Sequence, residues 1–350
     1  MDRETLHRFL YDMLLARRFE ERAAEEYAKG NIAGFLHLYP GEEAVAVGVL
    51  HATEPSDYIV STYREHVHAL VRGIQAKQVM AEIFGRHDGI CGGMGGSMHL
   101  FDRDRRFMGG YAIVGETYPI AIGIAYAIAM RNLPEAVVCF FGDGAVNQGT
   151  FHESLNMAAL WKLPVLFVCE NNHYQIGTEI HRHSAVTEVH KRAQAYHIPA
   201  EKIDGMDVLK VFEAARLALQ RVREGEGPQF LELETYRFRG HSMADPGAYR
   251  PQIEVRAFEA NDPVSVAIGE LELRYPSEEE LARVGSDGIR NFTEHCMTEG
   301  HLNEHHLKGM KQEVQRVVED AAAFASQSPE PTMEDAWGFL TRNQRHEELI

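Results

Sequence analysis

Two apolar runs in the sequence each end in residues that can bind a cation. Residues 137–141 have the composition of a buried strand and run into Gly-Asp-Gly, with Asp143 between the glycines. Residues 165–169 form a second such run and continue into Glu-Asn-Asn, with Asn172 last. Ligands bind where the strands of an open parallel sheet end, so we expect Asp143 and Asn172 to lie near each other at that edge.

The oxygen atoms of Asp143 and Asn172 suit Mg²⁺, but they are too few to form a closed site. Mg²⁺ prefers an octahedron of oxygens and is usually held by one or two carboxylates together with phosphate oxygens and water. A helix predicted from about residue 149 would bring free backbone N–H groups to the same edge, which favours a phosphate group. The pattern predicts a site for Mg²⁺ and a diphosphate. The simpler alternative for Gly-Asp-Gly is a tight turn without a ligand.

Other features of the sequence disfavour other kinds of site. The chain has no Gly-x-x-x-x-Gly-Lys-Ser/Thr motif, which argues against P-loop nucleotide hydrolysis. It has 19 histidines, but none stands in a His-Glu-x-x-His or Cys/His ligand motif, and the pairs at 181–183 and 304–307 are expected on the surface. The absence of a Cys-x-x-Cys pair favours reduced thiols and a cytoplasmic protein. The four cysteines are Cys91, Cys139, Cys169 and Cys296.

The composition predicts a globular chain that binds neither nucleic acid nor membranes. Hydrophobic residues make up 45% and charged residues 25% of the 350 residues, and the formal net charge of −17 disfavours polyanionic partners. The longest apolar run, residues 120–130, is far shorter than the roughly 20 residues of a membrane span, so a buried helix is expected. Residues 1–30 are charged and helical in pattern, unlike a signal peptide.

Apolar strands and helices alternate through the middle of the chain. Continuously apolar strands separated by helices are typical of a parallel sheet covered on both faces. The predicted fold class is therefore α/β, with a doubly wound parallel sheet. The predicted strands are 57–62, 136–141, 164–169, about 200–203 and 228–235, and the predicted helices between them are 74–86, 117–131, 149–161 and 207–224.

Helical segments flank this central region. Residues 2–29 carry apolar positions at helical spacing, and residues 41–52 predict a second, more buried helix. We expect an N-terminal helical segment (1–50), a diphosphate-binding α/β domain (51–250) and a C-terminal helical extension (251–350).

Two loops are expected in this central domain. The five glycines of residues 89–99 predict a loop of unusual geometry, and residues 237–251 predict a long polar loop.

Several strings extend the pattern around Asp143. They are GDGAVNQGTFHESLNMAALWKLPVLFVCENNHYQIGT (142–178), FLHLYPGEEAVAVG (35–48), STYREHVHAL (61–70), GGMGGSMHLF (92–101), IDGMD (203–207) and TYRFRGHSMADP (235–246). Together they resemble the alpha subunits of thiamine-diphosphate-dependent 2-oxo acid dehydrogenases of bacterial and plastid type. The resemblance runs from about residue 5 to 265.

The resemblance implies a role for each matching residue. Asp143, the Asn172 side chain and the Tyr174 carbonyl would ligate Mg²⁺. His37 would face the 2-oxo acid, His241 would reach the diphosphate from its loop, and both are candidate catalytic residues. The residues expected to contact thiamine diphosphate are Tyr63, Arg64, Ala112, Val114, Gly142, Asp143, Gly144, Ala145, Asn172 and His241.

The resemblance also implies that other protein chains take part in the reaction. Thiamine diphosphate supplies the electron sink for decarboxylation of a 2-oxo acid. In this family a glutamate on a second domain activates the cofactor, and the present chain has room for only one doubly wound domain. We expect a separate beta subunit in an α₂β₂ tetramer, and transfer of the acyl group to the lipoyl-bearing acyltransferase component. Pyruvate is the favoured substrate. Acetoin and branched-chain 2-oxo acids remain alternatives, as does a module that binds Mg²⁺ and diphosphate without catalysis.

Three further expectations concern single segments. Ser242 stands where eukaryotic relatives are phosphorylated, and a phosphate beside His241 would repel the cofactor diphosphate. The small residues Gly115, Gly123 and Ala127 suit close helix packing, either at a subunit contact or at a crossing within the chain. Residues 271–306 are longer than the family link by roughly twenty residues, and no function is assigned to them.

Overall fold

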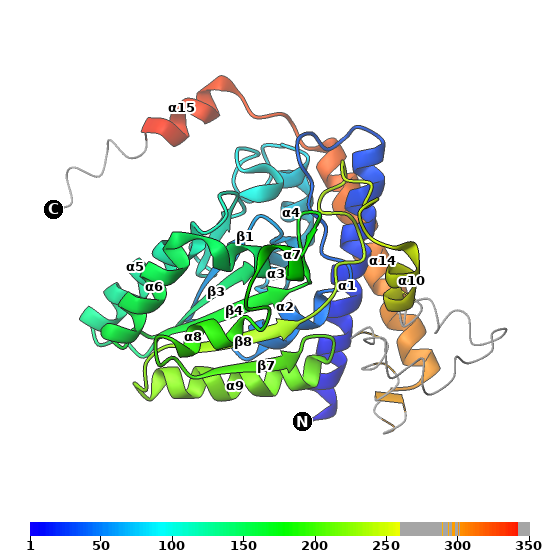
Figure 1. Ribbon diagram of the computed structural model, residues 1–350. Coiled ribbons are helices and arrows are strands. Elements are labelled where there is room, and N and C mark those ends of the chain that lie inside the picture. The colour runs from blue at the N-terminus through cyan, green and yellow to red at the C-terminus, as the bar shows by residue number, and fades with distance from the viewer. Residues whose placement is uncertain (260–288, 290–292, 294–295, 298–299, 301, 342–350) are drawn as a thin grey trace.

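The structure is a computed structural model that describes residues 1–259 and 302–341, together with residues 289, 293, 296, 297 and 300. The expectation for residues 271–306 falls largely outside the described residues. A six-stranded sheet forms the centre of the described part (Figure 1). All five neighbouring pairs in the order β2-β1-β3-β4-β8-β7 are parallel. The strands are β1 Tyr58–Thr62, β2 Phe107–Tyr111, β3 Val137–Gly142, β4 Val165–Asn171, β7 Ala200–Asp204 and β8 Gln229–Glu234.

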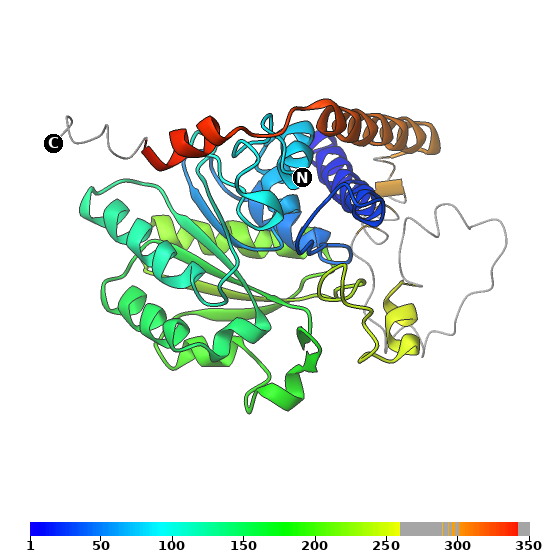
Figure 2. The same ribbon diagram turned by 90° about the horizontal axis from the view of Figure 1, so that it is seen from above.

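Helices cover both faces of the sheet, as the alternation in the sequence predicts. Successive side chains of β3 point to opposite faces: Cys139 and Phe141 enter the apolar cluster beneath α5, α6 and α8, whereas Phe140 enters the cluster on the other face. The second face is covered by α2, α4 and α9 (Figure 2). These helices are α2 Glu43–His51, α4 Ala76–Ile83, α5 Thr117–Met130, α6 Gly149–Leu160, α8 His190–Gln194 and α9 Val208–Arg223. The predicted fold class is confirmed.

The two longest helices come from opposite ends of the chain and lie side by side. They are α1 Arg3–Ala28 and α14 Glu304–Gln327, and both views show them next to each other (Figures 1 and 2). Asp2 caps α1 by accepting a hydrogen bond from the Thr5 amide, and Asn303 caps α14 in the same way through the His306 amide. Helix α15, Met333–Thr341, projects away from the body at the top of Figure 1.

Strand β2 and helix α3, His66–Val71, are among the elements that the sequence did not predict. Strand β2 contains two glycines in its five residues, and glycine weakens the strand signal. Helix α3 follows β1 after three residues and is too short to show a helical period. The remaining short elements are η1 Gly96–Met98, η2 Asp143–Asn147, β5 Tyr174–Gln175, β6 Thr178–Glu179, α7 Ile180–His183 and α10 Gln252–Glu259.

The most apolar helix, α5, packs against the sheet rather than forming a membrane segment. It has 14 residues, and a span needs about 20. Among the described residues, no helix combines the length and the apolar character needed to cross a bilayer.

Candidate active site

A pocket of about 310 Å³ lies where β1, β3 and β4 end. Loops from three other parts of the chain complete its wall, including the segments around residues 37–42, 111–115 and 237–241. Every residue expected to contact a cofactor, a metal ion or a substrate lines this one pocket. They are His37, Tyr63, Arg64, Ala112, Val114, Gly142, Asp143, Gly144, Ala145, Asn172, Tyr174 and His241.

Asp143 and Asn172 are brought to the pocket by neighbouring strands. Gly142 and Glu170 are partners in the register of β3 and β4, so the chain leaves both strands at nearly the same level. Asp143 begins η2 and is only 2% exposed. No described residue makes a hydrogen bond to its Oδ2 atom, although His183 Nε2 lies 3.5 Å from it. Asn172 is 8% exposed and donates from Nδ2 to Glu42 Oε1 at 3.0 Å.

The two glycines around Asp143 serve different purposes. A Cβ atom on Gly144 would lie 2.5 Å from Gln175 Cγ, so glycine permits the close approach of the β5–β6 hairpin. A Cβ atom on Gly142 would meet no protein atom within 4 Å. Gly142 therefore leaves space in the pocket wall beside Asp143.

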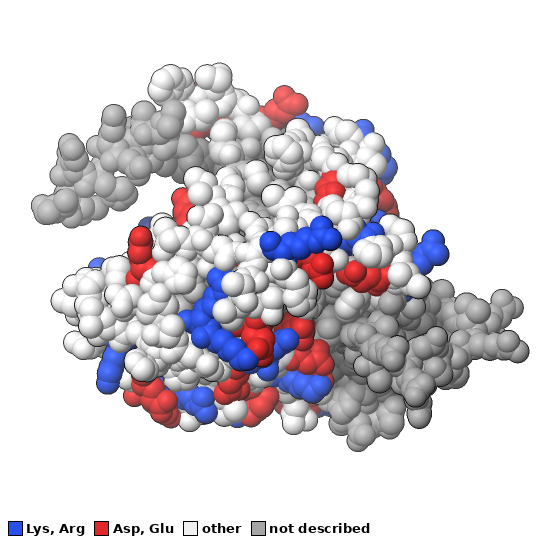
Figure 3. Space-filling view, viewed as in Figure 1, with Lys and Arg blue, Asp and Glu red and all other residues white. Residues whose placement is uncertain are grey.

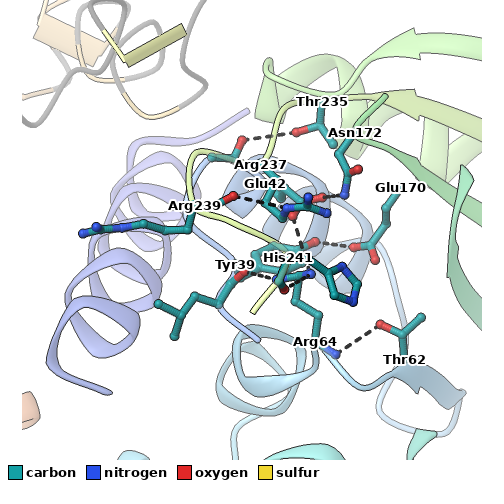
Figure 4. A network of polar contacts seen from close by, with 12 residues as sticks. Tyr39, Glu42, Thr62, Arg64, Glu170, Asn172, Thr235, Arg237, Arg239 and His241 are labelled. Atoms are coloured by element: carbon teal, nitrogen blue, oxygen red, sulfur yellow. Dashed lines mark hydrogen bonds and ion pairs between the residues drawn. The ribbon is translucent and has the colours of Figure 1, made fainter. Parts of the chain in front are cut away.

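Two buried guanidinium groups give the pocket positive charge. Arg64 donates to the carbonyl oxygens of Leu38 and His241 and so joins two loops of the pocket wall (Figure 4). Arg237 donates to the carbonyl oxygen of Ile176 at 3.0 Å. Burial, with the nearby charge of Arg237, lowers the pKa of Arg64.

Among the described residues, no carboxylate lies within ion-pair distance of Arg237, and the nearest pairing of Arg64 is with Glu42 at 3.9 Å. Such a pair of cations favours an anionic ligand.

Three aromatic rings form one wall of the pocket. The ring centroids of His37 and Tyr63 are 4.5 Å apart, those of His37 and His241 5.0 Å, and those of Tyr63 and His241 5.7 Å. Burial, together with the charge of Arg64, lowers the pKa of His37 to about 2 and that of His241 to about 3. Both imidazoles are therefore neutral near pH 7 and can donate or accept a hydrogen bond.

A group of buried acids behind Asn172 is absent from the sequence-based site. Glu42 and Glu170 both line the pocket, and the Tyr39 hydroxyl donates to Glu170 (Figure 4). Burial, together with the charge of Glu170, raises the pKa of Glu42 to about 7, although Arg64 opposes the shift. Glu42 precedes an apolar helix in the sequence, so nothing in its neighbourhood predicts that its carboxylate turns into the site. Arg237 is likewise hidden in a polar string with the composition of an ordinary loop.

The loop that carries His241 is held by its own polar side chains. Asp245 accepts hydrogen bonds from the amides of His241 and Gly247 and from the Tyr249 hydroxyl. Arg250 donates to the carbonyl oxygens of three residues at the start of the loop. Ser242 is half-buried within this loop and is not among the residues that line the pocket.

The segment 112–115 forms the open rim of the pocket. Ile113 is 70% exposed, and Val114 is also exposed although both line the pocket. Gly115 has a φ of +92° and approaches Thr150, whose hydroxyl donates to its carbonyl oxygen at 3.0 Å. The rim is thus anchored at Gly115, while its apolar side chains face solvent.

The polar atoms of the pocket fit a bound anion and cation. Buried atoms without a hydrogen-bond partner in the described part of the chain include His37 Nδ1, Glu42 Oε2, Asp143 Oδ2 and His241 Nδ1. These four atoms belong to residues that line the pocket, so they are available to the oxygens or the cation of a bound ligand. Within the described ranges, no group of three or more His, Cys, Asp or Glu side chains could hold a metal ion alone. A cation in this pocket needs oxygens from a ligand as well.

The fold and the pocket define an α/β protein with a pocket suited to an anionic ligand at the carboxyl edge of a parallel sheet. The chain belongs to the family described as the dehydrogenase E1 component, which it matches over residues 11–274. Family membership implies the use of thiamine diphosphate. The resemblance seen in the sequence strings is thereby confirmed.

Individual relatives carry a more specific name. The chain is 41% identical over 346 residues to the pyruvate dehydrogenase E1 component subunit alpha of Porphyra purpurea, covering 96% of this chain and 93% of the relative. It is 44% identical to the protein of the same name from Zymomonas mobilis, covering 96% of this chain and 88% of the relative. The corresponding protein of Rhizobium meliloti is 42% identical, with 93% of this chain and 87% of the relative covered.

Proposed function

We propose that the chain is the alpha subunit of a pyruvate dehydrogenase, which decarboxylates pyruvate oxidatively and acetylates a lipoyl group reductively. The names of its relatives support this substrate. The observation that carries the proposal is the convergence of Asp143, Asn172, Arg64 and Arg237 on one pocket whose buried polar atoms lack partners.

Residues of this pocket would hold the cofactor in two parts. Asp143, the Asn172 side chain and the Tyr174 carbonyl would hold Mg²⁺, which the diphosphate oxygens complete. Arg64, Tyr63 and His241 would contact the diphosphate, with Gly142, Gly144 and Ala145 against it. When bound, thiamine diphosphate supplies a nucleophilic carbon and an electron sink for decarboxylation. Ala112 and Val114 would support its rings from the rim.

The chain's own contribution to catalysis is to bind and orient. His37 and His241 are neutral near pH 7, so each can donate one hydrogen bond to an anionic substrate through one ring nitrogen and accept a proton at the other. Arg64 holds the backbone of His241 at 2.9 Å, which fixes this imidazole relative to the diphosphate site. We propose His37 as the residue that faces the 2-oxo acid.

A beta subunit would cover the exposed apolar surface on α5 and α6. We define this α5–α6 surface by Tyr126, Met130, Leu133, Met157, Leu160 and Trp161, which are all exposed. The region over these helices, on the left of Figure 3, carries few charged side chains. A Cβ atom on Gly123 would meet no atom within 4 Å, and Ala127 is exposed, so these two small residues of α5 support a subunit contact. Gly115, which precedes α5, instead approaches Thr150 within the chain. Large exposed apolar patches mark protein interfaces.

The other proposed features follow from the same interpretation. We propose a division of the chain at residues 50 and 250 and a cytoplasmic location. We also propose an α₂β₂ assembly and a lipoyl-bearing acyltransferase partner. Regulation through Ser242 is proposed on its position next to His241. The bacterial relatives support the location.

Co-production with a beta subunit tests the function. The purified assembly, with Mg²⁺ and thiamine diphosphate, is assayed with pyruvate, acetoin and 3-methyl-2-oxobutanoate and an artificial dye as electron acceptor. We expect the highest kcat/KM for pyruvate and no activity of the alpha chain alone. A preference for either other substrate would assign the sibling enzyme. Cofactor binding without any turnover would assign a non-catalytic module, and turnover by the alpha chain alone would overturn the shared site.

A further inference from the structure

The amide group of Asn172 is held in one orientation by a carboxylate. Asn172 donates from Nδ2 to Glu42 Oε1 at 3.0 Å, and the dashed line in Figure 4 marks this contact. The Asn172 Oδ1 atom accepts from the Tyr174 amide at 3.3 Å and retains a second lone pair. The ionised form of Glu42, which the charge of Arg64 and the hydrogen bond from Asn172 both favour, only accepts hydrogen bonds. It therefore faces the NH₂ side of the amide and leaves the oxygen side for other partners.

Glu42 is itself fixed in place. Its carboxylate is almost fully buried, with the residue 1% exposed, and its Oε2 atom lies 3.9 Å from Arg64 Nε. Its backbone amide donates to the Tyr39 carbonyl at 3.0 Å in the turn that precedes α2. A side chain so enclosed has few other rotamers, and its oxygen therefore acts as a fixed acceptor for Asn172.

We propose that Glu42 is a positioning residue that presents Asn172 Oδ1 to the cation of the diphosphate site. The inference rests on the proposed function, because it requires a cation at Asp143 and Asn172. If the amide rotated by half a turn, its NH₂ group would face the cation, and a donor cannot ligate a metal ion. Partners that orient a metal ligand in this way typically change metal affinity about 10- to 100-fold when they are removed.

Two substitutions of Glu42 separate its acceptor role from its charge. In the α₂β₂ assembly with saturating thiamine diphosphate, Mg²⁺ affinity is measured by titration calorimetry. We expect Glu42→Leu to weaken Mg²⁺ binding about 10- to 100-fold. Glu42→Gln keeps an oxygen that accepts from Asn172, so its Mg²⁺ affinity should stay within about threefold of the unsubstituted assembly. Equal losses in both variants would show that only the charge matters, and would overturn the proposal.

The choice of ion distinguishes an orientation effect from general damage to the pocket. Ca²⁺ accepts irregular geometry, whereas Mg²⁺ demands a near-ideal octahedron. Glu42→Leu should therefore weaken Mg²⁺ binding more than Ca²⁺ binding. An equal loss for both ions, or no loss for either, would contradict the proposal.

If Glu42→Leu does not fold, an exchange of the carboxylate and amide groups between positions 42 and 172 provides a second test. Asn172→Asp places two carboxylates against each other and should lose Mg²⁺ affinity despite its extra charge. Adding Glu42→Gln to that variant restores a donor-to-acceptor pair, and affinity should recover. Failure to recover would overturn the positioning role. If the unsubstituted assembly bound neither cofactor nor Mg²⁺, the proposed function itself would fail instead.

Discussion

The diphosphate end of the pocket, formed by Asp143, Asn172 and Arg64, and the α5–α6 surface differ sharply in solvent exposure. Asp143, Asn172 and Arg64 are at most 8% exposed and are held by strand ends and two loops. On the α5–α6 surface, by contrast, Met130 is 65% and Leu160 70% exposed. Under the proposed function, a small ligand would satisfy the polar atoms of the first region, and a protein would cover the apolar area of the second. The difference supports the proposal that this chain anchors the cofactor and that a beta subunit completes the active site.

The largest expected effect is at the diphosphate end. Asp143→Ala removes the carboxylate that would bind Mg²⁺, and we expect no measurable binding of thiamine diphosphate with Mg²⁺ and no turnover in the α₂β₂ assembly. Calorimetry measures the binding. The exposed Asp104 provides a matched control, and Asp104→Ala should bind normally. Unchanged affinity in Asp143→Ala would refute the site assignment.

A negative charge on the His241 loop should also abolish turnover. In Ser242→Glu the new carboxylate lies beside His241 and near the acidic Asp245, which holds the loop through the His241 amide at 2.6 Å. Repulsion from Asp245 and from the diphosphate should move the loop away from the pocket. Steady-state turnover of pyruvate measures the effect, with Ser242→Ala as the neutral control. Full activity of the Glu variant would mean that the loop need not lie against the cofactor.

A charge on the α5–α6 surface should affect assembly rather than the pocket. Met130→Asp buries a carboxylate if the beta subunit covers this surface, and we expect association to weaken about 100-fold or more. Light scattering after size-exclusion chromatography measures the assembly. Leu217 on α9 is also an exposed apolar residue, and Leu217→Asp serves as a control on the opposite face of the sheet. Dissociation by Leu217→Asp alone would assign the contact to the other face.

The smallest expected effect is a pH dependence of stability that arises at the pocket. The pKa values of His37 and His241 lie below the ordinary value of 6.5, because both rings are buried beside Arg64. Below about pH 6.5 the unfolded chain binds protons that the folded chain does not, so stability falls as the pH falls. The thermal midpoint of the assembly should drop between about pH 7 and pH 5.5. The drop should be smaller in a variant with His37→Gln and His241→Gln, and an identical drop would contradict the assignment.

Much of the fold could be predicted because it follows from local patterns. Strands β3 and β4 are continuously apolar, and the parallel arrangement makes their ends coincide, so the sequence alone was enough to pair Asp143 with Asn172. Strand β2 could not be predicted, because its glycines carry little strand propensity and its place is set by pairing with β1. The small residues Gly115, Gly123 and Ala127 left two alternatives open, because the sequence cannot show that Gly115 approaches Thr150 within the chain while Gly123 meets no other residue.

By itself, the sequence determined five of the six strands of the sheet, most of its covering helices and the strings whose resemblance implies thiamine diphosphate. Those features depend on residues close together in the chain, whose periodicity and spacing are visible in the order of the amino acids. Only the tertiary structure decided which charges share the pocket. Glu42, Asn172 and Arg237 are far apart in sequence, and their contacts form because three separate loops meet at one sheet edge. No local sequence pattern predicts these contacts between distant loops. For the same reason, the orientation of the Asn172 amide could be inferred only from the carboxylate that the fold brings against it.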